Sequence, residues 1–127
     1  MTIRRNTSLV VDEAGAAAVE FALIAPVFFA MLLGIFYSSM LGFSSASLHS
    51  AVESAARCRS MGIECTNPAT TQTHARKQFS NVTGAKSVFA STTQACGNRV
   101  TGTVNFHFDW VISDTIVPLT AAACFPA

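Results

Sequence analysis

The feature that most constrains this chain is a long apolar run without charges near its N-terminus. Residues 21–52 contain no Asp, Glu, Lys or Arg, and within them Phe21–Phe43 has 18 apolar residues out of 23. A helix needs about 20 such residues to cross the hydrocarbon core of a bilayer. A soluble helix this long and this uninterrupted would be unusual. The run therefore predicts a transmembrane helix, which we place at residues 16–43.

The rest of the composition narrows the class of function. Only 12% of the 127 residues are charged and the net charge is +1, whereas about a quarter of an ordinary soluble chain is charged. The Lys and Arg residues form no basic stripe, so we expect no nucleic-acid partner. No phosphate-binding loop, dinucleotide fingerprint or Gly-x-Ser-x-Gly motif occurs. We interpret His107 and Asp109 as polar residues on the open face of a strand, and expect no enzyme, no cofactor and no small-molecule substrate.

The N-terminal segment has three competing interpretations. A conventional cleaved signal has an apolar core of about 7–15 residues before a small-x-small site; Ser45-Ala46-Ser47 fits the site, but the core before it is too long. A plain signal anchor fits the length and leaves Glu20 unexplained. The third is a prepilin-type leader, cut before the apolar run so that the run remains in the mature chain.

Glu20 favours the third interpretation. A charged residue at the centre of a membrane helix costs about 2.5–3.5 kcal/mol, so an embedded carboxylate calls for a partner. Cutting after Gly15 would make Ala16 the first residue and Glu20 the fifth. The new amine of Ala16 would then lie about 6 Å from Glu20 along the helix axis, on the same face. The alternative is that Glu20 reaches the interface of an unprocessed anchor.

The string from Asp12 to Pro26, Asp-Glu-Ala-Gly-Ala-Ala-Ala-Val-Glu-Phe-Ala-Leu-Ile-Ala-Pro, resembles the TadE-like pseudopilins of tight-adherence (Tad) pilus systems. Three later strings also resemble that family: Ala55-Ala56-Arg57-Cys58, Ala95-Cys96-Gly97-Asn98 and the terminal Thr120 to Pro126. The resemblance therefore extends over nearly the whole chain.

The resemblance implies a function and partners. A prepilin peptidase would cut between Gly15 and Ala16, and Glu20, Phe21 and Ala16 would act in assembly, the glutamate contacting the N-terminal amine of a neighbouring subunit. The chain would be a minor pilin or pseudopilin of a Flp-type pilus, acting in pilus assembly and adherence with other Tad subunits and inner-membrane assembly proteins. The alternative is an uncleaved membrane-anchored binding module that acts through an exported sheet.

The expected fold is α+β and pilin-like, with residues 1–15 as leader and 44–127 as an exported domain. The membrane helix continues as an amphipathic helix to about Gly62, with Leu48, Val52, Ala55 and Cys58 on its apolar face and His49, Glu53 and Arg57 on a solvated one. A second helix is predicted from Pro68 to about Val82. Three antiparallel strands follow, at about Ser87–Thr93, Val100–Trp110 and Ile116–Cys124, with a turn at Cys96-Gly97-Asn98, and Phe106, Phe108 and Trp110 are expected in the core. Pro26 predicts a kink in the membrane helix.

None of the four cysteines belongs to a Cys-x-x-Cys motif. They therefore favour disulfides rather than a metal site, and disulfides indicate an oxidising compartment. Of the three possible pairings we choose Cys58–Cys65, which is local, and Cys96–Cys124, which ties the last strand to the sheet. Zinc is not expected, because the spacing is irregular. Arg4 and Arg5 precede the span and the cysteines follow it, so we expect a cytoplasmic N-terminus and the cysteines outside. The resemblance to the TadE-like family implies that the membrane crossed by this single-pass protein is the bacterial inner membrane.

Overall fold

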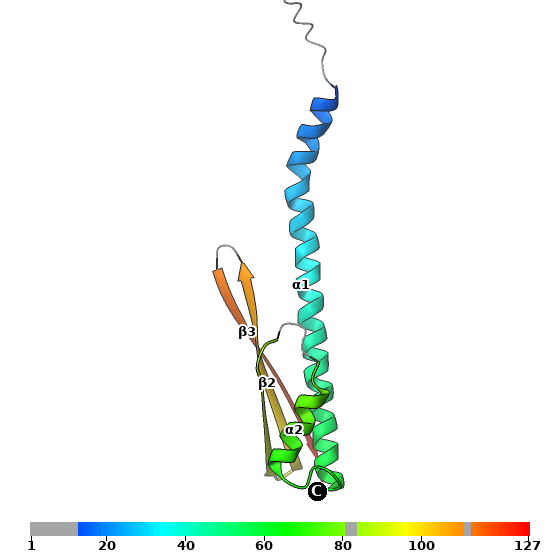
Figure 1. The fold of residues 1–127 in the computed structure, drawn as a ribbon, viewed down its shortest axis with the longest axis vertical. Helices are drawn as coiled ribbons and strands as arrows, with labels where there is room; N and C mark the ends of the chain where they lie inside the picture. Colours follow the sequence, from blue (N-terminus) through cyan, green and yellow to red (C-terminus); the bar gives the residue numbers. More distant parts are fainter. Residues whose placement is uncertain (1–12, 81–83, 111–112) are drawn as a thin grey trace, which may run out of the picture. The chain divides into compact units, whose positions relative to one another are not determined.

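The computed structural model describes residues 13–80, 84–110 and 113–127, arranged as two helices followed by three strands. The chain divides after Tyr37 into two compact units, and helix α1 (Glu13–Met61) contributes to both. The second unit also contains helix α2 (Pro68–Gln78) and strands β1 (Ser87–Gln94), β2 (Gly97–Trp110) and β3 (Ser113–Phe125) (Figure 1). A long N-terminal helix, a short second helix and an antiparallel sheet confirm the predicted α+β class.

Helix α1 ends where the sequence predicts. Its last residue is Met61, and Gly62 follows with φ +67°, a left-handed conformation that glycine adopts without a steric penalty. The amide of Gly62 donates to the carbonyl of Cys58 and closes the last turn. Pro26 lies inside the helix; the kink expected there remains a prediction.

Helix α2 begins at a complete capping box. The Asn67 side chain accepts from the amide of Thr70, the Thr70 hydroxyl accepts from the amide of Asn67, and Pro68 opens the helix. The predicted end near Val82 is wrong, because the helix stops at Gln78 and Phe79 is already extended. The ring of Phe79 packs edge-on against Phe89 of β1, with centroids 6.1 Å apart. This contact with the sheet accounts for the early end of the helix.

The sheet has the order β1-β2-β3, and each strand is antiparallel to its neighbour. The three strands are longer than predicted, because strand pairing extends further than expected: Gln94 lies opposite Gly97, and Trp110 opposite Ser113. The first turn consequently lies at residues 95–96, and Gly97, predicted in the turn, is the first residue of β2.

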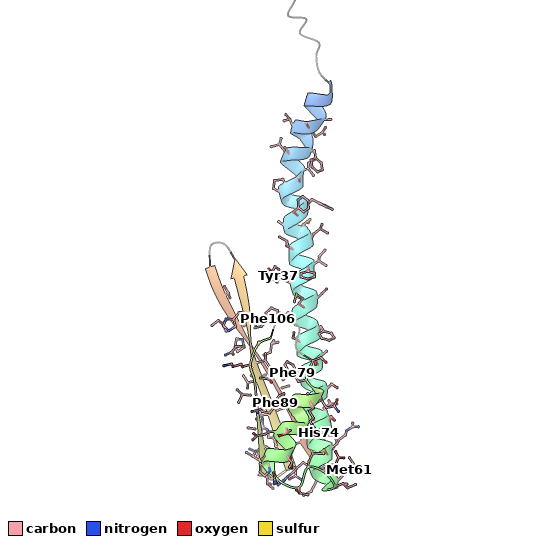
Figure 2. The ribbon with its side chains drawn as sticks, in the orientation of Figure 1. Tyr37, Met61, His74, Phe79, Phe89 and Phe106 are labelled. Atoms are coloured by element: carbon pink, nitrogen blue, oxygen red, sulfur yellow. A yellow bond between two sulfur atoms is a disulfide. The ribbon has the colours of Figure 1, made fainter. Side chains whose placement is uncertain are left out.

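The core lies between the inner face of the sheet and the second half of α1. The predicted apolar face of α1 is buried from Leu48 to Cys58, while the predicted solvated face is exposed. Phe106 is 1% exposed, as predicted for the core, whereas the side chains of Phe108 and Trp110 lie outside the described residues. Figure 2 labels Phe79, Phe89 and Phe106 among the side chains of this unit. The buried apolar residues are Leu48, Ala51, Val52, Ala55, Ala56, Ala75, Phe89, Val100, Val104, Phe106 and Ala121.

Candidate functional site

The predicted processing and assembly residues lie in the first turns of α1. Gly15, Ala16, Glu20 and Phe21 are all exposed, and all belong to the helix that begins at Glu13. Ala16 and Glu20 are four residues apart and therefore share one face. Residues 1–12 of the predicted leader lie outside the described residues. The Gly15–Ala16 peptide bond thus lies within the first turn of α1.

The part of α1 that follows Glu20 exposes an almost continuous apolar surface. By length and composition it is able to cross a membrane, since the best window within Gly15–Met61 has a mean hydropathy of 2.3 and none of that window is buried. Phe21 is 69% exposed and Leu23 73%. Isolated exposed apolar side chains are normal, but a large contiguous patch marks a membrane or protein contact. The large exposed residues are Val19, Phe21, Leu23, Ile24, Val27, Phe28, Phe29, Met31, Leu32, Leu33, Ile35 and Phe36.

This arrangement, a carboxylate in the first turns of an exposed apolar helix, coincides with a family match. Residues 15–57 match the family model of TadE-like protein. The resemblance inferred from the sequence is thereby confirmed over residues 15–57, which include Gly15, Ala16, Glu20 and Phe21. The match covers about a third of the chain and ends before Cys58, so the resemblance of the later strings remains a prediction. No curated protein and no solved structure matches the chain.

The structure joins the cysteines in the pairs chosen from the sequence. Cys58 and Cys65 are bonded with a Cα–Cα distance of 5.5 Å, and Cys96 and Cys124 with one of 6.2 Å. The first bond closes the segment between α1 and α2, and the second fastens β3 to the β1–β2 turn.

The last strand also contacts α1 directly. The Ser60 hydroxyl donates to the carbonyl of Phe125 at 3.5 Å, and the guanidinium of Arg57 lies 5.2 Å from the centre of the Phe125 ring. Arg57 is exposed as predicted, but it also makes this cation–π contact, which at exposed sites contributes about 0.5–1 kcal/mol. Its role is therefore partly structural.

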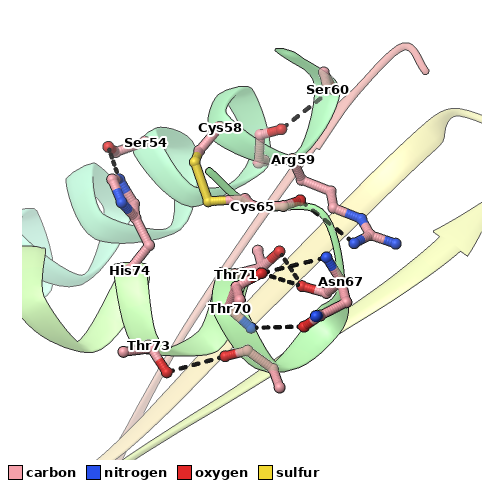
Figure 3. The surroundings of a disulfide bond; sticks show 12 residues. Ser54, Cys58, Arg59, Ser60, Cys65, Asn67, Thr70, Thr71, Thr73 and His74 are labelled. Carbon is pink, nitrogen blue, oxygen red and sulfur yellow. Dashed lines mark hydrogen bonds between the residues drawn. A yellow bond between two sulfur atoms is a disulfide. The ribbon is translucent and has the colours of Figure 1, made fainter. Parts of the chain in front are cut away.

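A group that the sequence did not indicate lies beside the first disulfide. His74 of α2 faces Ser54 of α1, with Nε2 3.2 Å from the serine Oγ (Figure 3). Its ring and both sulfur atoms of the Cys58–Cys65 bond are close together. An open groove of about 550 Å³ runs past them, lined among others by Glu53 and Glu64. The sequence offered no signal for this cluster, since His74 belongs to no metal or catalytic motif.

The other polar pair considered in the sequence forms no described site. His107 is exposed on the outer face of β2, as expected for a polar residue on an open face. The side chain of Asp109 lies outside the described residues.

Proposed function

We propose that this chain is a minor pilin or pseudopilin of a Tad-type pilus system, cut after Gly15 and acting in pilus assembly and adherence. The observation that carries the proposal is the match to the TadE-like family over residues 15–57, which contain both Gly15 and Glu20. The one helix able to span a membrane, among the residues that the structure describes, fits a Tad pilus-related protein. TadE-like proteins are structural rather than enzymatic, and we extend that role to this chain.

At the start of α1, the proposed chemistry is the pairing of the Glu20 carboxylate with an ammonium group inside the membrane. Cleavage would give Ala16 a free ammonium group four residues before the Glu20 carboxylate, on the same face of α1. Either its own amine or that of a neighbouring subunit would offset the cost of placing this carboxylate in a bilayer. A prepilin peptidase is the proposed processing partner.

The exposed apolar surface of α1 suits both a subunit inserted in the membrane and a subunit assembled into a filament. In the membrane it would be covered by lipid, and in a filament by the helices of other pilus subunits. Because lipid tails are as apolar as these side chains, exchange between the two is controlled by packing and by polar pairs rather than by hydrophobicity. A single polar residue near the helix start therefore has a large influence on assembly.

The proposed topology places residues 1–15 in the cytoplasm, residues 16–43 in the inner membrane and residues 44–127 outside. The cysteines support this orientation, because both bonded pairs follow the span and disulfides persist in oxidising compartments. Inner-membrane assembly proteins and other Tad subunits are the expected partners.

The test replaces Glu20 with Ala and compares pilus formation, membrane insertion and the mature N-terminus. We expect the variant to insert but to lose pili or their initiation. Glu53→Ala is the matched control, because Glu53 is an exposed carboxylate on the same helix outside the apolar run, and it should leave pili unchanged. Mass spectrometry of the wild-type chain should find Ala16 at its N-terminus. A chain beginning at Met1, with normal pili in Glu20→Ala, would favour the membrane-anchored binding module instead.

A further inference from the structure

Three metal-binding side chains meet where α1, the following loop and α2 come together. Cys58 lies in the last turn of α1, Cys65 in the loop that follows, and His74 in the second turn of α2. One sulfur from each cysteine and one ring nitrogen of His74 all lie within 4.8 Å of one another. Cys65 is 1% exposed and Cys58 9%, so the sulfur atoms are largely shielded from solvent.

We propose that the dithiol form of this chain binds one Zn²⁺ through Cys58, Cys65 and His74. Zinc–sulfur bonds of about 2.3 Å and zinc–nitrogen bonds of about 2.0–2.1 Å in a tetrahedron place two sulfurs about 3.8 Å apart and a sulfur and a nitrogen about 3.6 Å apart. The present separations do not exceed 4.8 Å. The site therefore requires the two sulfurs, which are bonded to each other in this structure, to separate to about 3.8 Å after reduction.

The surroundings hold these ligands in place. The Ser54 hydroxyl is 3.2 Å from Nε2 of His74, and a histidine that pairs one nitrogen with an oxygen partner offers the other nitrogen to a metal. The capping box at Asn67 fixes the start of α2, and Arg59 donates to the carbonyl of Cys65 at 3.4 Å. These contacts come from residues on both sides of the cluster, so they keep the three ligand side chains near one another.

The fourth position of the tetrahedron is left to water or to a carboxylate. The groove beside the cluster is open and is lined by Cys58, His74, Glu53 and Glu64. Two thiolates balance the charge of Zn²⁺, which removes the penalty for burying an unpaired charge. The site has the soft sulfur and nitrogen donors that zinc prefers.

Disulfide and metal exclude one another at this site. Reduction transfers two electrons and two protons from a dithiol reductant, which becomes a disulfide, to the Cys58–Cys65 bond. Binding of Zn²⁺ then displaces the two thiol protons. The metal would hold the α1–α2 junction closed in chains whose disulfide has not formed, independently of the pilus role proposed above.

The experiment titrates Co²⁺, then Zn²⁺, into the full chain in detergent micelles. The protein is first reduced by a water-soluble phosphine, which becomes the phosphine oxide, and is kept free of oxygen. We expect one Co²⁺ per chain with the strong absorption of tetrahedral thiolate-bound cobalt, its displacement by Zn²⁺, and no such signal from the oxidised chain. The Cys96→Ser/Cys124→Ser variant should bind as the wild type does.

Substitutions of His74 and His49 test whether His74 is a metal ligand. His74→Ala should weaken Co²⁺ binding about tenfold or more, since even the loss of a supporting partner costs about 10–100-fold. His49→Ala is the control, because His49 is exposed on α1 and lies outside the cluster. Ser54→Ala, which keeps all three ligands, should weaken binding less than His74→Ala. Absence of cobalt binding by the reduced wild type, an octahedral spectrum, or equal losses in the His74 and His49 variants would each overturn the proposal.

Discussion

Gly102 lies against the core side chains, and a single added methyl group there should destabilise the unit formed by Ser38–Ala127. A Cβ at this position would lie 2.8 Å from Cε1 of Phe89, 2.9 Å from Cδ1 of Leu48 and 2.9 Å from Cγ2 of Val52. Carbon atoms pack at about 3.5–4.0 Å, so three side chains on β1 and α1 would have to move. The backbone of Gly102 is not in the left-handed region, so the cost comes from crowding alone.

We expect Gly102→Ala to lower the free energy of unfolding by about 1–3 kcal/mol, the usual cost of overfilling a packed core. At an m-value of about 1.5 kcal/mol/M, a loss of 2 kcal/mol moves the urea midpoint down by about 1.3 M. Pulse proteolysis of the full chain in micelles at increasing urea measures this midpoint. Gly42→Ala is the control: among the described residues nothing lies within 4 Å of its added Cβ, and alanine favours a helix over glycine.

A double variant tests whether crowding is the cause. Val52→Ala removes one of the three obstructing atoms and by itself costs about 2 kcal/mol, for two methyl groups at about 0.8 kcal/mol each plus a cavity term. Combined with Gly102→Ala, the total loss should fall short of the sum by about 0.5 kcal/mol or more, since the two residues are in contact. Strict additivity, or a neutral Gly102→Ala, would refute this account of the core.

Three further changes follow from the structure. Gly97→Ala should cost more than Gly102→Ala in the same urea assay, because Gly97 has φ +114° and its Cβ would clash with the backbone of Phe125; an equal midpoint would contradict this. Asn67→Ala removes the cap of α2 and should cost about 1 kcal/mol, seen as faster hydrogen exchange confined to the first turn of that helix. Replacing Cys96 and Cys124 by Ser opens a loop with a sequence separation of 28 and should cost about 3–4 kcal/mol, measured as a lower melting temperature that reductant lowers less than it lowers that of the wild type, because only Cys58–Cys65 remains to be reduced.

The order and type of the elements were predictable from the sequence, because each has a strong local pattern. The uncharged run beginning at Phe21 required a long helix, and the alternation that begins at Val100 required a half-buried strand. The end of α2 was not predictable in this way, since nothing local stops a helix at Gln78. The contact of Phe79 with Phe89 is made across the fold, and only the folded chain reveals it.

The two candidate sites also differ in how far they could be predicted from the sequence, because one is local in the chain and the other is not. Gly15 and Glu20 are five residues apart on one helix, so their relation could be worked out from helical geometry. His74 is brought to Cys58 and Cys65 by the reversal of the chain between α1 and α2. The number of residues between Cys65 and His74 matches no metal motif, and a reversal of this kind leaves no periodic signal. Sequence reasoning therefore gave no indication of the cluster around the disulfide.

The sequential order of the sheet implies how the unit formed by Ser38–Ala127 folds. Every strand pairs with the next one along the chain, so both hairpins close short loops and are expected to form quickly. Docking onto α1 is different, because the bond between Ser60 and the carbonyl of Phe125 spans 65 positions. A folding chain can thus hold a complete sheet whose apolar face is still exposed to water. We expect the docking of that sheet onto α1 to be the slower step, and until it is complete the exposed apolar face can associate with other chains.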